Sequence, residues 1–468
     1  MRFSATAAAE RLLPPRFAVM ARPLFDRLDS ILSAPDERAE ARRVSLIAFA
    51  IRVVSAVIAF VSQVLMARWI GSFEYGIFVL VWTAAVIAGN LSCLGFHTSV
   101  IRFIPEFRAK HMLNELRGIL VASRIFVLVA STLITAIGAG IVWALSDRIE
   151  NYYVAPFLIG LLCLPMIALS DLMQGVSRAH AWAVSAFSPT YITRPVLILV
   201  FMAGALAWGY PATALTAIVA TLAATYATTI VQLVTVTTRV DRKVPKGAAT
   251  VDLRGWLVVS LPIFLVESFF FLLTNADVLV VGRFMDPDSV AFYFAAVKTL
   301  ALVHFVYFAV KAGVAQRYSA YSHADPAGLA AFARETVSWT FWPSLLMAVV
   351  VMIVGEPMLS LFGPEFTQGY PLLFVLVLGV VARAAVGPAE SLLTMTGNQN
   401  VCAGVYALTL AVNLGLSFLL IPILGLWGAA IATAASMVFE AAALSFTVWR
   451  KLGIAMAIFI PATRQEPG

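Results

Sequence analysis

Twelve long apolar runs are the feature that most limits what this chain can fold into. They lie at 45–70, 76–95, 118–146, 154–175, 182–208, 212–236, 256–284, 290–310, 337–361, 370–394, 401–423 and 428–448. An α-helix needs about 20 apolar residues to cross a hydrocarbon core of about 30 Å. The sequence therefore predicts an all-α membrane protein of about twelve transmembrane helices.

Composition agrees with this prediction. The chain of 468 residues is 61% hydrophobic and 12% charged, with a mean hydropathy of +0.92. A soluble domain needs more charge on its surface. The formal net charge of +7 would suggest a nucleic-acid partner in a soluble protein. In a membrane protein it reflects basic loops on one side, so we expect no nucleic-acid partner.

The basic residues predict an orientation. Of the 32 Lys and Arg residues, 24 fall in segments on the same side as the N-terminus. Three lie on the opposite side: Arg68, Arg148 and Arg283. Because cytoplasmic loops collect Lys and Arg, we expect both termini in the cytoplasm of a multi-pass plasma-membrane protein. The loops on the other side are short, which disfavours an enzyme that needs a large outer domain.

A weak internal repeat suggests two halves. The segments "QVLMARWIGSFEYGIFVLVWT" (63–83) and "DVLVVGRFMDPDSVAFYFAAVKT" (277–299) share an apolar helix end, a tight acidic turn and an aromatic start to the next helix. The junctions "LMQGVSRAHAWA" and "LLTMTGNQNVCA" recur at a similar offset. We therefore expect a cytoplasmic extension (1–44), a six-helix bundle (45–240), a basic linker (241–255), a second six-helix bundle (256–450) and a cytoplasmic tail (451–468).

These segments carry a family resemblance. With "ARWIGSFEYGIFVL", "LGFHTSVIRFIPEF" and "NADVLVVGRFMDPDSVAFYFAA", the chain resembles the polysaccharide transporters, the O-antigen-type flippases. Their superfamily includes multidrug exporters and lipid II flippases. The resemblance implies a V of two bundles around a central cavity, in the bacterial inner membrane. It implies a polyprenyl-pyrophosphate-linked oligosaccharide as substrate, with membrane lipid and other glycan assembly proteins as possible partners. The N-terminal extension departs from the family pattern.

Five basic residues lie within the predicted spans, where a charge costs about 3 kcal/mol on insertion scales. They are Arg52, Arg124, Arg194, Lys298 and Arg383. The first three belong to the first half, which is net basic within the membrane. Since guanidinium groups match phosphate oxygens bidentately, we expect the five residues to bind the substrate pyrophosphate. A kink is expected near Arg194, because a proline follows it.

The intramembrane acids lie mainly in the second half. We expect Glu267, Asp277 and Glu390 to act in ion coupling or gating, with Glu267 as the leading carboxylate because it is mid-span. Other interpretations stay open. Glu390 lies seven residues after Arg383 and could form a structural pair with it, and Asp277 could cap a helix or pair in a gate. Asp171 and Glu440 could reach the cytoplasmic surface.

Nothing in the sequence indicates an enzyme, a cofactor or a metal site. There is no phosphate-binding G-x-x-x-x-G-K-[ST] loop, no H-E-x-x-H motif and no G-x-S-x-G motif. The three cysteines and five histidines are scattered. The leading interpretation is a flippase. The alternatives are a cation-coupled multidrug exporter, a membrane glycosyltransferase or ligase, and a non-transporting scaffold.

Overall fold

The computed structural model describes residues 37–245, 247–324 and 326–458. Within these ranges it leaves out the side chains of 37–50, 52, 312, 315–316, 323–324 and 326–327. The described residues form helices and turns, without a β-strand. Most of the predicted extension 1–44, and the end of the predicted tail 451–468, lie outside the described residues.

The helices of the first half follow one another with short turns. They are α3 (Glu37–Ser92), α4 (Phe96–Ala109), α5 (Leu113–Ala144), η1 (Ser146–Arg148), α6 (Asn151–Leu161), α7 (Leu164–Ala179), α8 (Ala183–Ser188), the π-helical turn η2 (Pro189–Thr193), α9 (Arg194–Ala207) and α10 (Ala214–Asp241).

The second half begins after the linker. Its helices are α11 (Leu253–Leu273), α12 (Ala276–Phe284), α13 (Pro287–Ala324), α14 (Pro326–Ser360), η3 (Pro364–Gly369), α15 (Tyr370–Ala384), α16 (Ala389–Met395), α17 (Gln399–Leu424) and α18 (Leu426–Leu452).

The described helices are long and apolar enough for a multi-pass membrane protein. Ten stretches qualify as spans, and the pair α6–α7, bent by 41°, adds an eleventh. One of the ten, Val53–Ala109, has 57 residues and contains a kink at Gly71, where φ is 79°. At about 1.5 Å per residue this stretch is long enough to cross an about 30 Å core twice. Dividing it at Gly71 brings the count to the predicted twelve.

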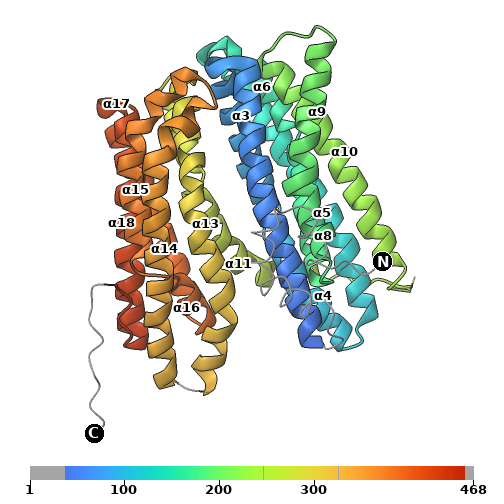
Figure 1. Cartoon of the computed structure of the whole chain (residues 1–468). Helices are drawn as coiled ribbons and strands as arrows, with labels where there is room; N and C mark the ends of the chain where they lie inside the picture. Colours follow the sequence, from blue (N-terminus) through green and yellow to red (C-terminus); the bar gives the residue numbers. More distant parts are fainter. Residues whose placement is uncertain (1–36, 246, 325, 459–468) are drawn as a thin grey trace, which may run out of the picture.

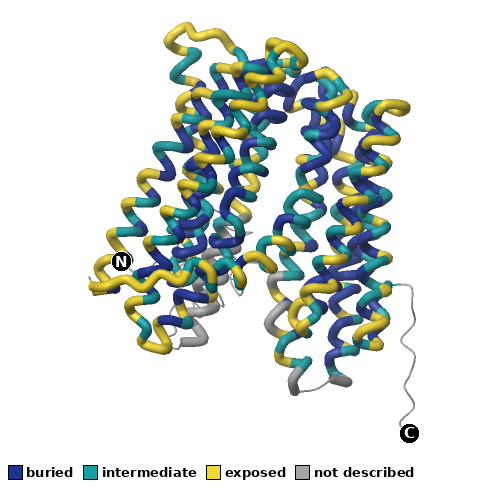
Figure 2. Tube along the Cα trace, turned by 180° about the vertical axis from the view of Figure 1, so that it is seen from behind, coloured by how far each residue is buried: buried dark blue, intermediate teal, exposed yellow. Residues whose placement is uncertain are grey.

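The outward faces of the helices carry apolar side chains. Val231, Ile353 and Ile423 are 65%, 71% and 72% exposed, and buried residues concentrate between the helices (Figure 2). In water such a surface would favour aggregation, whereas in a bilayer it contacts acyl chains.

The helices form two groups that meet at one end of the molecule and diverge toward the other (Figure 1). Hydrophobic packing explains this V. At the end that contains Gly71, the "Gly71 end", one continuous core joins α3 to α12, α13 and η3 through residues such as Tyr75, Phe292 and Phe366. Toward the opposite end, where Arg117 lies, the cores separate into one for each group. This is the V-shaped architecture that the resemblance implies.

Helix α11 connects the two groups. Trp256, near its start, is buried in the separate core of the first group, while Phe270 and Leu273 pack against that of the second. The linker before it is fastened to the first group, because Arg117 donates from Nε to the carbonyl of Pro245 at 2.7 Å. The start of α11 is therefore fixed to the first group and its end to the second.

The two junctions that the sequence paired adopt the same turn. After α7 the N–H of Trp182 donates to the carbonyl of Ser177 at 2.9 Å, and after α16 the N–H of Asn398 donates to that of Leu393 at 2.8 Å. The residue before each donor has positive φ, 57° at Ala181 and 82° at Gly397. Both helices thus end in a six-residue hydrogen-bonded cap.

Candidate functional site

A cavity of 460 Å³ lies between the two groups of helices. Both arms of α3 form one wall, and α13, α14 and the break between α11 and α12 form the other. The lining residues are Val53, Ala56, Val57, Ala59, Phe60, Gln63, Trp82, Thr83, Val86, Asn275, Phe294, Lys298, Ala301, Leu302, Phe305 and Met347. Most of the wall is apolar, and a few polar groups lie in it.

Lys298 is the only charged residue among the lining side chains that the structure describes. It lies eleven residues after Pro287, so it sits about 16 Å along α13. Its Nζ is 4.7 Å from the ring centroid of Phe294, within cation–π range. The side chain is accessible within the cavity although it lies deep in the helix bundle. The ammonium group can therefore meet an anion that enters the cavity.

A helix break positions polar groups beside Lys298. Helix α11 ends where Thr274 and Asn275 hydrogen-bond back to the carbonyls of Phe270 and Phe271, at 3.1 and 2.9 Å. Such side chains compete with the helix ladder and favour its end. The break leaves Asn275 on the cavity wall.

Asp277 lies just behind this wall. It is 6% exposed and accepts from the Tyr293 hydroxyl at 2.8 Å and from the N–H of Val278 at 2.9 Å. The same Tyr293 hydroxyl lies 3.0 Å from Thr433 Oγ1. Asp277 also interacts electrostatically with Lys298. Its carboxylate is thus held in place and balances the lysine charge.

An aromatic cluster closes the cavity toward the Gly71 end. The ring centroid of Tyr75 lies 6.2, 6.4 and 6.0 Å from those of Phe294, Phe362 and Phe366. Its hydroxyl donates to Oε1 of the lining residue Gln63 at 2.7 Å. We call Tyr75, Phe294, Phe362 and Phe366 the aromatic seal.

Two further contacts join the groups beside the seal. Arg68 donates from Nε and Nη2 to the carbonyls of Leu361 and Ser360, at 2.7 and 2.8 Å. A cation at the C-terminal end of α14 also interacts favourably with the helix dipole. At Gly76 a Cβ would lie 1.7 Å from the carbonyl oxygen of Pro287. The backbones of α3 and α13 therefore touch, and only glycine permits it.

Glu267 makes a polar contact between the groups. Its Oε2 accepts from Thr98 Oγ1 at 2.6 Å and lies 3.2 Å from Nε2 of His97. Both partners belong to α4 and Glu267 belongs to α11. About two turns earlier in α11, Ser260 Oγ donates to Ser99 Oγ at 2.7 Å. The mid-span carboxylate thus faces the first group rather than the cavity.

Glu390 and Arg383 belong to a buried ion cluster within the second group. Nη2 of Arg383 lies 3.8 Å from Oε2 of Glu390 and 3.2 Å from Oε1 of Glu440. Lys311 pairs with Glu390, and the Arg383 guanidinium lies 4.8 Å from the ring centroid of Tyr307. The structure therefore forms the Arg383–Glu390 pair that the sequence left open, and Glu440 joins it.

Arg124 and Arg194 are not among the residues that line the cavity. Arg194 is 4% exposed inside the first group, where Asp171 acts on it electrostatically. Its Nε and Nη2 have no hydrogen-bond partner among the described residues. Arg124 interacts electrostatically with Asp241. Arg52 lies in α3 directly before the lining residue Val53, and its side chain is outside the described part.

The kink expected near Arg194 is a π-helical turn. Pro189–Thr193 has π-helical geometry, and the N–H of Arg194 donates to the carbonyl of Pro189. Pro195 follows directly and has no N–H to continue the ladder. The distortion therefore precedes the proline, as a wide turn instead of a sharp bend.

Sequence reasoning missed several polar residues that surround the cavity or join the groups. These are Gln63, Arg68, Tyr75, Thr83, His97, Thr98 and Asn275. All fall inside the repeat segments or resemblance motifs. Their position within these motifs could therefore have identified them. Most of these residues carry no formal charge, so a search for charges inside the spans does not find them.

Comparison with known families agrees with this architecture. Residues 42–315, more than half of the chain, match the family described as polysaccharide biosynthesis protein. The chain belongs to this family. Residues 262–419 also match the MatE family. The first of these two matches, residues 42–315, extends from α3 through most of α13. It therefore includes nearly all of the cavity wall.

Solved structures share the fold at low identity. An inward-facing multidrug resistance MATE family transporter of the MOP superfamily aligns with a TM-score of 0.69 and 15% identity, over 85% of this chain and 94% of the other. The lipid II flippase MurJ in an inward closed conformation aligns with a TM-score of 0.65 and 14% identity, over 86% of this chain and 87% of the other. A MOP superfamily transporter from Pyrococcus furiosus aligns with a TM-score of 0.60 and 14% identity, over 89% of this chain and 96% of the other. No curated protein matches the chain.

Proposed function

We propose that this protein is a flippase that moves a polyprenyl-pyrophosphate-linked oligosaccharide from the inner to the outer leaflet. The observation that carries the proposal is the cavity between the two groups, with Lys298 as its charged group. An apolar wall suits the lipid part of such a substrate. An ammonium group suits the pyrophosphate. Amide and hydroxyl groups such as those of Gln63, Thr83 and Asn275 can hydrogen-bond sugar hydroxyls.

The same features support transport by alternating access. With both termini in the cytoplasm, the Gly71 end is the outer end and the separated cores lie on the cytoplasmic side. The closed aromatic seal then corresponds to a state that accepts substrate from inside. We propose that the bundles 45–240 and 256–450 rock about the shared core, joined by the linker 241–255. Arg52, one residue before the lining residue Val53, is proposed as a second cation for the pyrophosphate.

A multidrug exporter is the second candidate, because residues 262–419 match the MatE family and the wall is largely apolar. Lys298 weighs against it for cationic drugs, because like charges repel in a site of low dielectric. A sugar-transferring enzyme is the third, and we propose that the protein is not an enzyme.

Reconstitution tests the three candidates together. We expect vesicles with the full-length protein to expose a fluorescent polyprenyl-pyrophosphate oligosaccharide to an outside glycosidase at least about tenfold faster than protein-free vesicles. In parallel vesicles without the glycosidase, the substrate should be recovered chemically unchanged by mass spectrometry. If the vesicles transported a cationic dye but did not transport the glycolipid, the result would support the multidrug exporter. A transferred sugar would support the enzyme, and either result would overturn the proposal.

We propose Glu267 as the residue that couples opening to a cation or proton, because it links α11 to His97 and Thr98 of the opposite group. Glu267→Gln keeps the shape but removes the charge. Transport by this variant should lose most of its dependence on an imposed pH or Na⁺ gradient, while transport without a gradient remains. Glu106→Gln, which changes a half-exposed carboxylate on α4, serves as control. Equal gradient dependence in Glu267→Gln and the unmodified protein would exclude this role.

A further inference from the structure

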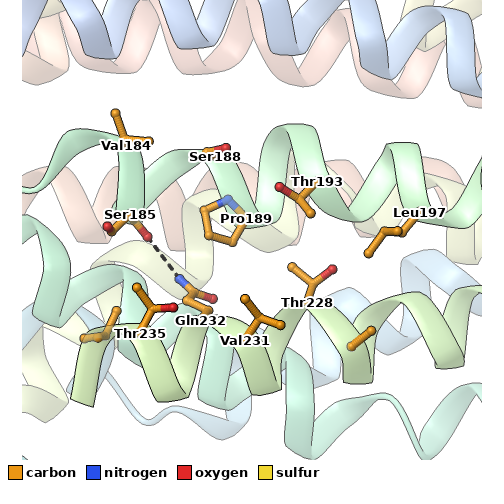
Figure 3. A pocket seen from close by; sticks show the side chains of 12 residues that line it. Val184, Ser185, Ser188, Pro189, Thr193, Leu197, Thr228, Val231, Gln232 and Thr235 are labelled. Carbon is orange, nitrogen blue, oxygen red and sulfur yellow. Dashed lines mark hydrogen bonds between the residues drawn. The ribbon is translucent and has the colours of Figure 1, made fainter. Parts of the chain in front are cut away.

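A groove of 240 Å³ lies on the first group, apart from the central cavity. Helices α8 and α9 with the turn η2 form one side, and α10 forms the other (Figure 3). Gln232 reaches across it from α10, and its Nε2 donates to the carbonyl of Ser185 at 3.4 Å. Val184 and Val231 on its two sides are 58% and 65% exposed. The groove therefore opens to the surroundings of the protein.

The wide turn η2 helps to form this groove. A π-helical turn bulges from the helix axis and displaces the residues beside it. Pro189 and Thr193 begin and end this turn, and both line the groove. The lining is mostly apolar, and its polar members are hydroxyls and the amide of Gln232.

A cationic cluster lies at one mouth of the groove. Nζ of Lys243 and the guanidinium carbon of Arg239 lie 5.2 and 5.7 Å from the ring centroid of Trp182. Nη1 of Arg239 also donates to Oγ of the groove residue Ser185 at 2.9 Å. A guanidinium group has further N–H donors after that bond. Both cations are exposed and can bind a ligand.

Two titratable groups lie near this mouth: His180 beside Trp182, and Asp241 between the two cations in the sequence. The imidazole of His180 stacks on Trp182 at 4.6 Å between centroids. Burial, with the nearby charges of Arg108 and Lys243, lowers the pKa of His180, so the ring stays neutral at pH 7. Asp241 is two residues from either cation in the sequence and interacts electrostatically with Arg124.

The dimensions and position suit a membrane lipid. Along α10 the groove runs from Val236 to Ala227, nine residues or about 13 Å. This is close to the depth of one leaflet of an about 30 Å core. Trp182, Arg239 and Lys243 lie at the end of the groove where α10 finishes and the basic linker begins. Tryptophan and basic residues at such a boundary are typical of the membrane interface.

We propose that this groove binds one anionic phospholipid, with its phosphate between Arg239 and Lys243 beside Trp182 and an acyl chain between α9 and α10. The site shares no residue with the central cavity. It is therefore a lipid site separate from the transport pathway, and its occupancy is independent of the proposed flippase activity.

Lipid retention tests the headgroup contacts. The full-length protein, purified from vesicles of phosphatidylglycerol and phosphatidylcholine, is assayed for bound lipid by native mass spectrometry. We expect one phosphatidylglycerol to be retained preferentially. Arg239→Gln with Lys243→Gln should weaken retention by roughly 25-fold, because each basic residue near an anionic surface contributes a factor of about five. Arg242→Gln with Arg254→Gln removes the same charge from the same surface and should change retention less than about twofold.

A second variant tests the acyl chain. Val231→Trp fills the groove and keeps both cations, so it should also release the phospholipid. Inorganic phosphate should not displace the lipid, since it lacks a chain. If both double variants lost lipid retention equally, the binding would be general electrostatic attraction to the protein surface and not a specific site. Retention unaffected by Val231→Trp, or displacement by inorganic phosphate, would overturn the lipid assignment. Preferential retention of a polyprenyl pyrophosphate over phosphatidylglycerol would show a substrate site instead.

Discussion

Lys298→Met is expected to lower glycolipid transport at least about tenfold in the vesicle assay, whereas Lys298→Arg keeps most of it. Methionine preserves the apolar length of the side chain and removes the charge that faces the cavity. A hydrogen bond to a charged group contributes about 1.5–3 kcal/mol, which corresponds to a tenfold to hundredfold effect. The initial rate of glycolipid exposure is the measurement.

A second effect of this substitution must be separated from substrate binding. Removing Lys298 leaves the buried carboxylate of Asp277 without its cation, which can destabilise the protein. Lys298→Met combined with Asp277→Asn restores neutrality, and this double variant should fold but remain inactive. Lys451→Met removes an exposed charge at the end of α18 and should be silent. Recovered transport in the double variant would show that Lys298 only balances Asp277.

Gly76→Ala is expected to open the Gly71 end and to lower transport by about tenfold or more. The new Cβ would overlap the carbonyl oxygen of Pro287, at 1.7 Å, so α3 and α13 must separate. The aromatic seal depends on this approach, because Tyr75 of α3 packs against Phe294 of α13. The state with a closed Gly71 end should therefore become less populated.

Spin labels measure this opening. Cysteines at Trp208, 87% exposed, and at the exposed Gln368 place one label on each group near the Gly71 end. The native cysteines Cys93, Cys163 and Cys402 are buried. Gly76→Ala should shift the label distances to longer values. The same substitution at Gly140, where a Cβ meets nothing within 4 Å, should leave distances and transport unchanged. Unchanged distances in Gly76→Ala would show that the seal does not need this contact.

Several features of the fold could be predicted because they depend on local sequence. In lipid a helix must satisfy its own backbone hydrogen bonds, so length and hydrophobicity are sufficient to mark each span. The turns that end α7 and α16 are also local, because six consecutive residues and one positive φ angle define each of them. The spacing of seven residues also suggested the Arg383–Glu390 pair, but the pair does not form on one helix face: Arg383 lies in α15 and Glu390 in α16, with a break between them.

The roles of the buried charges could not be predicted in the same way. Arg194 and Lys298 both looked like intramembrane cations in the sequence, yet Lys298 faces the cavity and Arg194 lies inside the first group. The direction of a side chain around its helix axis has meaning only once neighbouring helices are in place. Local hydrogen bonds of Thr274 and Asn275 favour the break after α11, but the position of Asn275 on the cavity wall depends on the packing of other helices.

The sequence by itself thus determined a multi-pass helical membrane protein of the polysaccharide biosynthesis family, because hydrophobic length and motif order are properties of consecutive residues. Only the tertiary structure decided where the two groups touch, which charge faces the cavity, and that Glu267 contacts His97 across the groups. These depend on side chains far apart in the chain. Their distances follow from how whole helices pack, which no single segment encodes.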